Sequence, residues 1–365
     1  MTRSRACESV TIDGLLMPMS RSFARGVFGV LFALAISSAP PAEAGEVRAD
    51  IRGAGATFPA PVYAAWAAAY LRESGVGIAY DAVGSGVGIE RIERGGADFG
   101  ATDAPLPQDE LERHGLVQFP MVVGGVVPVI NISGIKPGQL KLTGEAIADI
   151  YLGTIRKWND ARIAALNPDL KLPDANITVV HRSDASGSSL LWTDYLARAS
   201  ASWRTQVGSS LHPNWPAGVG GDGNEGVAAY VQRTRFAIGY VEYAFARAHR
   251  LSDAALRNRD GNYVQARRTA FRAAAAAADW TATPFVHQLP TDQPGAASWP
   301  VTGASFILLP TAAAQAAHTR AAQQFFDWAL QHGEPTAANL DYDTLPHAAI
   351  EAVRKAWRTA PAGAR

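Results

Sequence analysis

Short apolar runs and longer amphipathic segments follow one another along most of this chain. The apolar runs predict strands at residues 46–52, 77–83, 98–103, 119–132, 177–181, 237–241 and 305–309. The amphipathic segments predict helices at residues 62–71, 89–94, 144–151, 190–198, 267–278 and 314–332. This repeated order of strand, turn and helix is typical of an α/β fold in which helices cover a sheet. Residues 212–226 are rich in Pro and Gly, and we interpret them as a loop.

The valine-rich run at residues 119–132 is interrupted by Gly124-Gly125. Glycines in a buried strand can absorb a rotation of the backbone, so we expect the chain to cross between two domains here. We predict that residues 45–127 and 301–365 form domain I, to which the strand at 305–309 returns. Residues 128–300 then form domain II.

The first 44 residues carry the pattern of a signal peptide. A basic segment at 20–25 precedes an apolar segment at 26–36, and Ala42-Glu43-Ala44 is a typical cleavage signal. The apolar segment is too short to span a bilayer. We therefore expect a soluble periplasmic protein that begins at Gly45 after cleavage, with Met1, Met17 or Met19 as alternative starts.

Charge and cysteine content narrow the possible functions. The chain has 33 basic and 33 acidic residues, whereas a protein that binds nucleic acid or an anionic membrane normally carries a basic excess. Its single cysteine, Cys7, precedes the predicted leader, so we expect no disulfide. Affinity for a small anion would have to come from local dipoles rather than from net charge.

Three short stretches combine glycine with a hydroxyl residue just ahead of a predicted helix, at residues 53–58, 84–86 and 186–188. Backbone N–H groups at such helix starts bind oxyanions. Arg182, Asp184 and Asp103 stand nearby in the sequence, and together these features suggest an enclosed ion of the size of phosphate. Taken singly, the stretches are also compatible with ordinary turns, and the Arg182 segment with a surface ion pair beside a helix cap.

Signatures of catalysis are weak. The sequence contains no phosphate-binding P-loop, no G-x-S-x-G motif and no H-E-x-x-H motif, and its histidines are scattered, so we expect no catalytic residue, no cofactor and no metal. His181 next to Arg182 is more compatible with a loop or capping role than with catalysis. Residues 221–226 match G-x-G-x-x-G, but they follow a Pro/Gly loop, so we interpret them as a turn rather than a dinucleotide site.

Taken together, these segments resemble the periplasmic phosphate-binding proteins of phosphate-specific ABC transporters. The similar segments run in order over most of the chain: GAGATFPAPVY, GSGVGI, DFGATDAPL, FPMVVGGVVPVIN, DIYLGTIRKWND, NITVVHRSDASGSS, GGDGNEGVAAYV, AIGYVEYAFA, WPVTGASFILLP and FFDWAL. The resemblance implies a two-domain hinged periplasmic-binding-protein fold of type II with the ligand in the interdomain cleft. It implies a monomer that binds inorganic phosphate with high affinity and delivers it to the membrane permease subunits of an ABC transporter with its ATPase.

The resemblance also implies which residues bind the ion. They are Thr57, Phe58 (through its backbone), Ser85, Asp103, Arg182, Ser186, Gly187 and Ser188, with Asp184 behind Arg182. Asp103 matches a carboxylate that accepts a proton from the ligand, although an aspartate that caps the turn before Pro105 is an alternative. Ala185 stands where glycine is common, which puts the loop shape in question, and Ser188 stands where threonine is common.

Two other functions remain open at this point. A receptor for another oxyanion such as sulfate is disfavoured because Asp103 would face a ligand without a proton. A secreted phosphatase is disfavoured because the sequence shows neither a nucleophile with its base nor a metal cluster.

Overall fold

The computed structural model describes residues 50–280, 289–312 and 315–359. All of them belong to one compact unit, Val47–Arg365. The predicted signal peptide lies outside the described residues. Among the helices of the described ranges, none combines the length and the apolar character that crossing a membrane requires.

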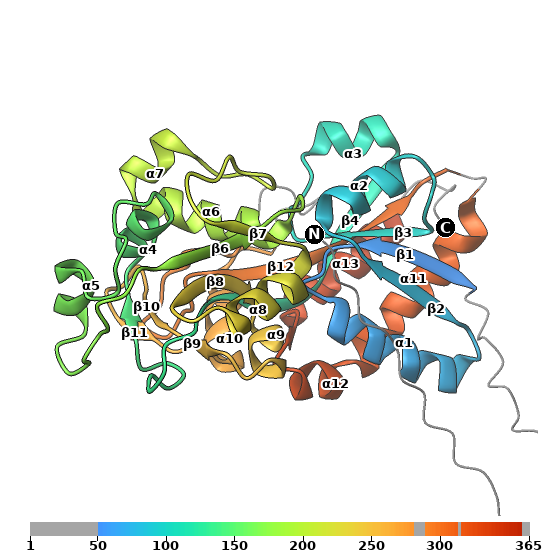
Figure 1. The fold of residues 1–365 in the computed structure, drawn as a ribbon. Helices are drawn as coiled ribbons and strands as arrows, with labels where there is room; N and C mark the ends of the chain where they lie inside the picture. The colour runs from blue at the N-terminus through green and yellow to red at the C-terminus, as the bar shows by residue number, and fades with distance from the viewer. Residues whose placement is uncertain (1–49, 281–288, 313–314, 360–365) are drawn as a thin grey trace, which may run out of the picture. The chain divides into compact units, whose positions relative to one another are not determined.

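A 10-stranded mixed sheet organises the described chain, with the strand order β2-β1-β3-β12-β4-β8-β6-β7 and with β13 and β9 also pairing with β4 (Figure 1). Its strands are β1 (Ile51–Gly55), β2 (Ile78–Ala82), β3 (Phe99–Thr102), β4 (Leu116–Ile130), β6 (Thr178–Arg182), β7 (Val219–Gly221), β8 (Ala237–Glu242), β9 (Ser252–Asp253), β12 (Thr302–Pro310) and β13 (Asp343–Thr344). A small second sheet contains β5 (Lys141–Leu142), β10 (Ala255–Arg257) and β11 (Tyr263–Val264).

The long strand β4 joins two groups of parallel strands. Up to Gly125 it pairs antiparallel with β12, which in turn lies against the parallel group β3-β1-β2. From Val126 onward it pairs antiparallel with β8, which lies against the parallel strands β6 and β7. The change of partner falls directly after the glycine pair Gly124-Gly125.

Helices cover the sheet. They are α1 (Ala60–Ser74), α2 (Ser85–Glu93), α3 (Gln108–His114), α4 (Gly144–Tyr151), α5 (Ala161–Leu166), α6 (Gly187–Ala199), α7 (Ala201–Gln206), α8 (Gly223–Arg233), α9 (Tyr243–Ala248), α10 (Arg268–Ala277), α11 (Ala316–His332), α12 (Glu334–Asn339) and α13 (His347–Thr359). Helices α1, α2 and α11 contact the group of strands β1, β2, β3 and β12 (Figure 1). Helix α8 contacts β6 and β8, and α6 contacts β8.

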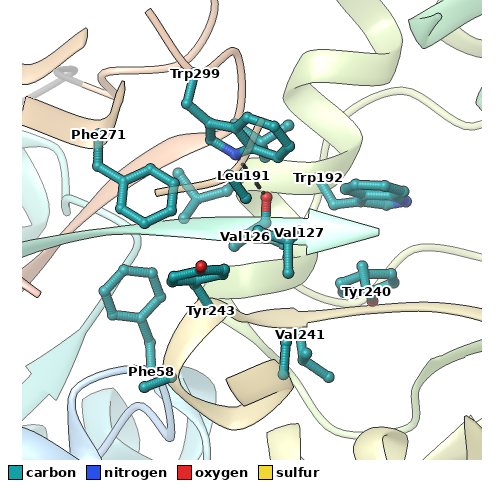
Figure 2. Packing of buried hydrophobic residues seen from close by; sticks show 14 of the residues in the cluster. Phe58, Val126, Val127, Leu191, Trp192, Tyr240, Val241, Tyr243, Phe271 and Trp299 are labelled. Atoms are coloured by element: carbon teal, nitrogen blue, oxygen red, sulfur yellow. Dashed lines mark hydrogen bonds between the residues drawn. The ribbon is translucent and has the colours of Figure 1, made fainter. Parts of the chain in front are cut away.

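The core consists mainly of aromatic and branched aliphatic side chains, which supply most of the buried apolar area. Figure 2 shows Val126 and Val127 of β4 among aromatic rings, with the indole nitrogen of Trp299 donating to the carbonyl of Val126 at 2.9 Å. This bond satisfies a backbone group of β4 just past the glycine pair, where the strand changes partners.

Most predicted elements are confirmed, and the helix at 144–151 has the predicted bounds. The loop predicted at 212–226 is wrong, because Val219–Gly221 form β7 and α8 begins at Gly223. A strand of one valine and two glycines has no side-chain pattern to reveal it, and it is held by backbone pairing with β6. The domain boundaries near residues 127 and 301 stay a prediction.

Candidate anion-binding site

Each of the three hydroxyl-containing stretches lies at the start of a helix. Ser85 is the first residue of α2, Ser186 caps α6 by accepting from the backbone N–H of Ser189, and Phe58 lies two residues before α1. The first N–H groups of a helix have no partner within it and carry the positive end of the helix dipole. The predicted helix starts are therefore present at all three stretches.

The second and third stretches meet at the side chain of Ser85. Its Oγ accepts hydrogen bonds from the backbone N–H of Gly187 at 3.1 Å and of Asp103 at 3.2 Å. A Cβ built on Gly187 would lie 2.4 Å from the Cβ of Asp103, so the close approach requires glycine there. Since Ser85 accepts twice, its own proton remains free for a further acceptor.

The first stretch is held by the start of α8. Thr57 Oγ1 accepts from Asn224 Nδ2 at 2.9 Å and from the backbone N–H of Asn224 at 3.3 Å. The neighbouring Gly223, with a φ of 63°, donates its N–H to Asp184 Oδ1 at 3.1 Å. The Gly223-Asn224 turn therefore connects Thr57 to the Arg182 segment and leaves the proton of Thr57 free to be donated.

Arg182 ends strand β6 and is buried. Its Nε donates to Asp184 Oδ1 at 2.7 Å and its Nη2 donates to Asp184 Oδ2. Although burial acts in the opposite direction, these bonds and the charge of Arg182 hold the pKa of Asp184 below its usual value. The bidentate pair fixes the guanidinium plane and leaves Nη1 without a partner among the described residues.

Three buried polar atoms of the predicted site make no hydrogen bond within the described chain: Asp103 Oδ1, Arg182 Nη1 and Ser188 Oγ. Buried polar atoms are costly unless they are hydrogen-bonded, so this group points to a polar ligand. Together with Thr57 and Ser85 it offers one cationic donor, three hydroxyl groups and one carboxyl.

Burial raises the pKa of Asp103 to about 8, with the charge of Arg182 and the hydroxyl of Ser305 acting in the opposite direction. Its carboxyl is thus more readily protonated than that of an exposed aspartate. The role expected for Asp103, a carboxylate that accepts a proton from the ligand, stays a prediction.

The doubt about the loop at Ala185 is not supported. Ala185 is not among the non-glycine residues with positive φ in the described chain. Its carbonyl accepts from the backbone N–H of Gly86 at 2.9 Å, and a Cβ built on Gly86 would lie 2.4 Å from the Ala185 methyl. The loop thus has a conformation open to alanine, and Gly86 makes room for the methyl group.

Comparison with known proteins shows the family. Residues 40–332 match the model of the PBP superfamily domain. The phosphate-binding protein PstS of Pasteurella multocida is 48% identical over 309 residues, which cover 85% of this chain and 90% of that protein. PstS of Haemophilus influenzae is 44% identical over 90% of this chain and 97% of its own length.

The chain belongs to the PstS family of phosphate-binding proteins. The resemblance inferred from the sequence is therefore confirmed, and so is the predicted α/β periplasmic-binding-protein fold. Two solved structures show the same fold. One is a high-affinity periplasmic phosphate-binding protein, PfluDING, bound with phosphate, with a TM-score of 0.67 and 19% identity over 85% of this chain and 94% of that one. The other is a phosphate-binding protein from Stenotrophomonas maltophilia, with a TM-score of 0.61 and 16% identity over 85% of this chain and 94% of that one.

Three polar residues behind the Thr57-Phe58 turn were not predicted from the sequence as part of the PstS site: Asn224, Glu242 and Tyr342. The 221–226 stretch gave a signal, because glycines before a helix are typical of a close backbone approach, but the loop interpretation removed it from consideration. His181 stacks on Trp215 with ring centroids 4.8 Å apart, and its Nδ1 lies 3.0 Å from the carbonyl oxygen of Arg182. These contacts agree with a structural role for His181.

Proposed function

We propose that this protein binds inorganic phosphate with high affinity in the periplasm and delivers it to the permease subunits of an ABC transporter, without catalysing a reaction on it. The observation that carries the proposal is the group of buried atoms without a partner in the described chain, Asp103 Oδ1, Arg182 Nη1 and Ser188 Oγ. The names of the curated relatives, which are phosphate-binding proteins, support it.

Every predicted site residue has a role in this proposal. Arg182 donates the charged hydrogen bond, and Thr57, Ser85 and Ser188 donate from hydroxyl groups. The backbone N–H of Phe58 adds a donor next to a helix start, and the Ser186 hydroxyl, whose oxygen accepts from the Ser189 N–H, adds another. Gly187 donates its N–H to Ser85 Oγ and so holds the two stretches together. Asp184 orients Arg182.

The expected affinity follows from the number and type of these bonds. Hydrogen bonds to a charged group contribute roughly 1.5–3 kcal/mol each. Removing phosphate from water and immobilising it offset a large part of that sum, so we expect a dissociation constant of about a micromolar or lower.

Asp103 supplies selectivity among tetrahedral anions. The complex holds one proton between Asp103 and the ligand, and either of them can bring it. Phosphate carries at least one proton over the whole neutral range, whereas sulfate carries none and relies on a proton already on Asp103. Above the Asp103 pKa of about 8, sulfate binding therefore requires uptake of a proton, and phosphate binding does not.

The domain organisation and export belong to the same proposal. Residues 1–44 serve as a cleavable signal peptide and the mature chain is a monomer. Domain I (45–127 and 301–365) and domain II (128–300) close around the ion, with β4 as one connection between them. The partner change of β4 after Gly125 supports the position of that connection.

Isothermal titration with phosphate and with sulfate at pH 9, above the Asp103 pKa of about 8, together with a phosphate-ester hydrolysis assay, tests the proposal. We expect phosphate binding at micromolar concentration or below, much weaker sulfate binding and no ester hydrolysis. Sulfate binding as tight as phosphate binding, or turnover of the ester, would contradict it.

A further inference from the structure

Three buried oxygen atoms lie in a row behind the Thr57-Phe58 turn. Tyr342 Oη is 2.7 Å from the carbonyl oxygen of Phe58 and 2.7 Å from Glu242 Oε2. All three residues are fully buried. Oxygen atoms at this separation are joined by a hydrogen bond, so each of the two contacts needs a proton.

The number of protons that these two contacts require places one proton on Glu242. A tyrosine hydroxyl has one proton and a backbone carbonyl has none, so two contacts between three oxygens need one more. If Glu242 were ionised, Tyr342 would donate to the carboxylate and its oxygen would face the Phe58 carbonyl without a proton. With a proton on Glu242, the carboxyl donates to Tyr342, and Tyr342 donates to Phe58.

The surroundings of the Glu242 carboxyl agree with this count. Its Oε2 also accepts from the backbone N–H of Ala244 at 2.8 Å, and its Oε1 has no partner in the described chain. Burial raises the pKa of Glu242 well above its usual range, against the hydrogen bonds from Tyr342 and from the Ala244 and Tyr243 backbone. The charge of Asp341 acts in the same direction as burial.

The groups around Tyr342 are also acidic or neutral. Glu242, Asp103 and Tyr63 all disfavour its ionisation, after the larger effect of burial. Arg247 pairs with Asp341 at 3.6 Å on the exposed side of this cluster. No arginine or lysine is among the influences resolved on Glu242 or Tyr342 within the described residues.

The cluster of Phe58, Glu242 and Tyr342 lies where β4 changes its partner strand. Glu242 pairs with Val126, and β13 begins directly after Tyr342 with the Asp343–Val123 pair. Between them, a Cβ on Gly124 would lie 2.9 Å from the Phe58 ring and 3.2 Å from Glu242 Oε1. Glycine at 124 therefore gives Phe58 and Glu242 the space they occupy.

Asn224 forms a second arm to the same turn. Its Oδ1 accepts from the backbone N–H of Glu242 at 3.0 Å, and its Nδ2 donates to Thr57 Oγ1. Thr57 and Phe58 are thus both held from behind, one through Asn224 and the other through Tyr342 and Glu242.

We propose that Glu242 and Tyr342 are positioning residues of the anion site, and that a proton held on Glu242 lets Tyr342 fix the Phe58 carbonyl. This holds the Phe58-Pro59 peptide in place and thereby keeps the adjoining Phe58 N–H directed at the ion. Loss of the proton redirects Tyr342 to the carboxylate and frees the turn. The inference rests on the proposed function for its effect on binding, whereas the protonation of Glu242 does not depend on it.

Infrared spectroscopy of the ligand-free protein at pH 7 tests the proton directly. We expect a carbonyl stretch of a protonated carboxylic acid that disappears in Glu242→Gln and shifts in Tyr342→Phe. Asp103→Asn assigns the separate band of Asp103. If subtraction of the Glu242→Gln spectrum reveals a carboxylate and no protonated acid, the proposal is overturned, whatever the protein binds.

Titration with inorganic phosphate tests the positioning role. We expect Tyr342→Phe to weaken binding about tenfold, because the Phe58 carbonyl loses a buried hydrogen bond. Tyr195→Phe is the matched control, since it removes a buried hydroxyl that donates to the carbonyl of Arg257, and it should leave the affinity unchanged. Thermal unfolding confirms that both variants are folded.

The pH profile separates positioning from a merely structural role. Wild-type affinity should fall at alkaline pH in a step that is missing in Glu242→Gln, whose amide keeps a donor for Tyr342. Wild-type affinity in a folded Tyr342→Phe protein, or the same alkaline step in Glu242→Gln, would overturn the positioning role. Failure of wild-type protein to bind phosphate would instead overturn the proposed function, and the infrared result would still decide the proton on Glu242.

Discussion

Asp103 and Glu242 are two buried carboxyls at the ends of strands, yet their surroundings differ. Asp103 follows β3, and Glu242 ends β8; burial raises the pKa of both, and each has one oxygen without a partner in the described chain. Asp103 faces the cation Arg182 and the donors of the anion site. Glu242 faces Tyr342 and backbone N–H groups, with an acidic neighbour. Under the two proposals, Asp103 therefore shares a proton with the ligand, whereas the proton on Glu242 stays inside the protein.

The largest expected effect is on the choice between anions, and it concerns Asp103 alone. Above the Asp103 pKa of about 8, where the carboxyl is ionised, a site built around a ligand proton rejects a ligand without one by about 10⁴ or more. Asp103→Asn supplies a donor in place of the ionised acceptor, so sulfate should compete with phosphate in a displacement titration at pH 9. Glu242→Gln is the matched change at the other carboxyl and should keep the preference. If sulfate fails to compete in Asp103→Asn, selectivity has another source.

Removing Arg182, the cation that faces Asp103 and not Glu242, should have the next largest effect on binding. Arg182→Ala should weaken phosphate binding by about 100-fold or more, because loss of one partner of a buried charged hydrogen bond costs roughly 2–5 kcal/mol. Arg162→Ala is the control, since Arg162 also binds an aspartate two residues away, Asp160, through Nε and Nη2, but at an exposed position. Calorimetric titration of both variants measures the difference, and equal affinities would remove Arg182 from the site.

The smallest expected effect is on the stability of the ligand-free protein, which should fall as pH rises because of both carboxyls. A carboxyl whose pKa is higher in the folded than in the unfolded protein contributes its full stabilisation of the fold below the pKa of the unfolded state. This contribution is lost as pH rises through the pKa of the folded state. For Asp103 the loss extends from about pH 4 to about pH 8. Asp103→Asn should therefore gain about 1–3 kcal/mol relative to wild type between pH 4 and 8 in denaturant titrations. A constant difference across this range would contradict the raised pKa.

Local motifs explain why the helix starts at the candidate site were predictable. Ser85, Arg182 and the Ser186-Gly187-Ser188 turn each combine a hydroxyl or a cation with a helix start, and such patterns span only a few residues. The bounds of α4 were likewise predicted because Thr143 caps a regular amphipathic segment. These features depend on neighbours in sequence, which a single chain reveals.

The polar cluster behind the site was not predictable because its contacts are long-range. Tyr342 is 284 residues from Phe58 and 100 from Glu242, and Asn224 is 167 from Thr57. Sequence periodicity gives no register between such segments. The raised pKa of Asp103 was not predictable for a related reason, since the degree of burial that raises it comes from packing of several elements.

A crystal structure of the protein grown with phosphate tests the central claim most directly. The account predicts one tetrahedral ion within hydrogen-bond distance of Arg182 Nη1, Ser188 Oγ and Asp103 Oδ1, with Tyr342 still between Phe58 and Glu242. Phosphate bound elsewhere, or bound without contact to Asp103 and Arg182, would contradict it.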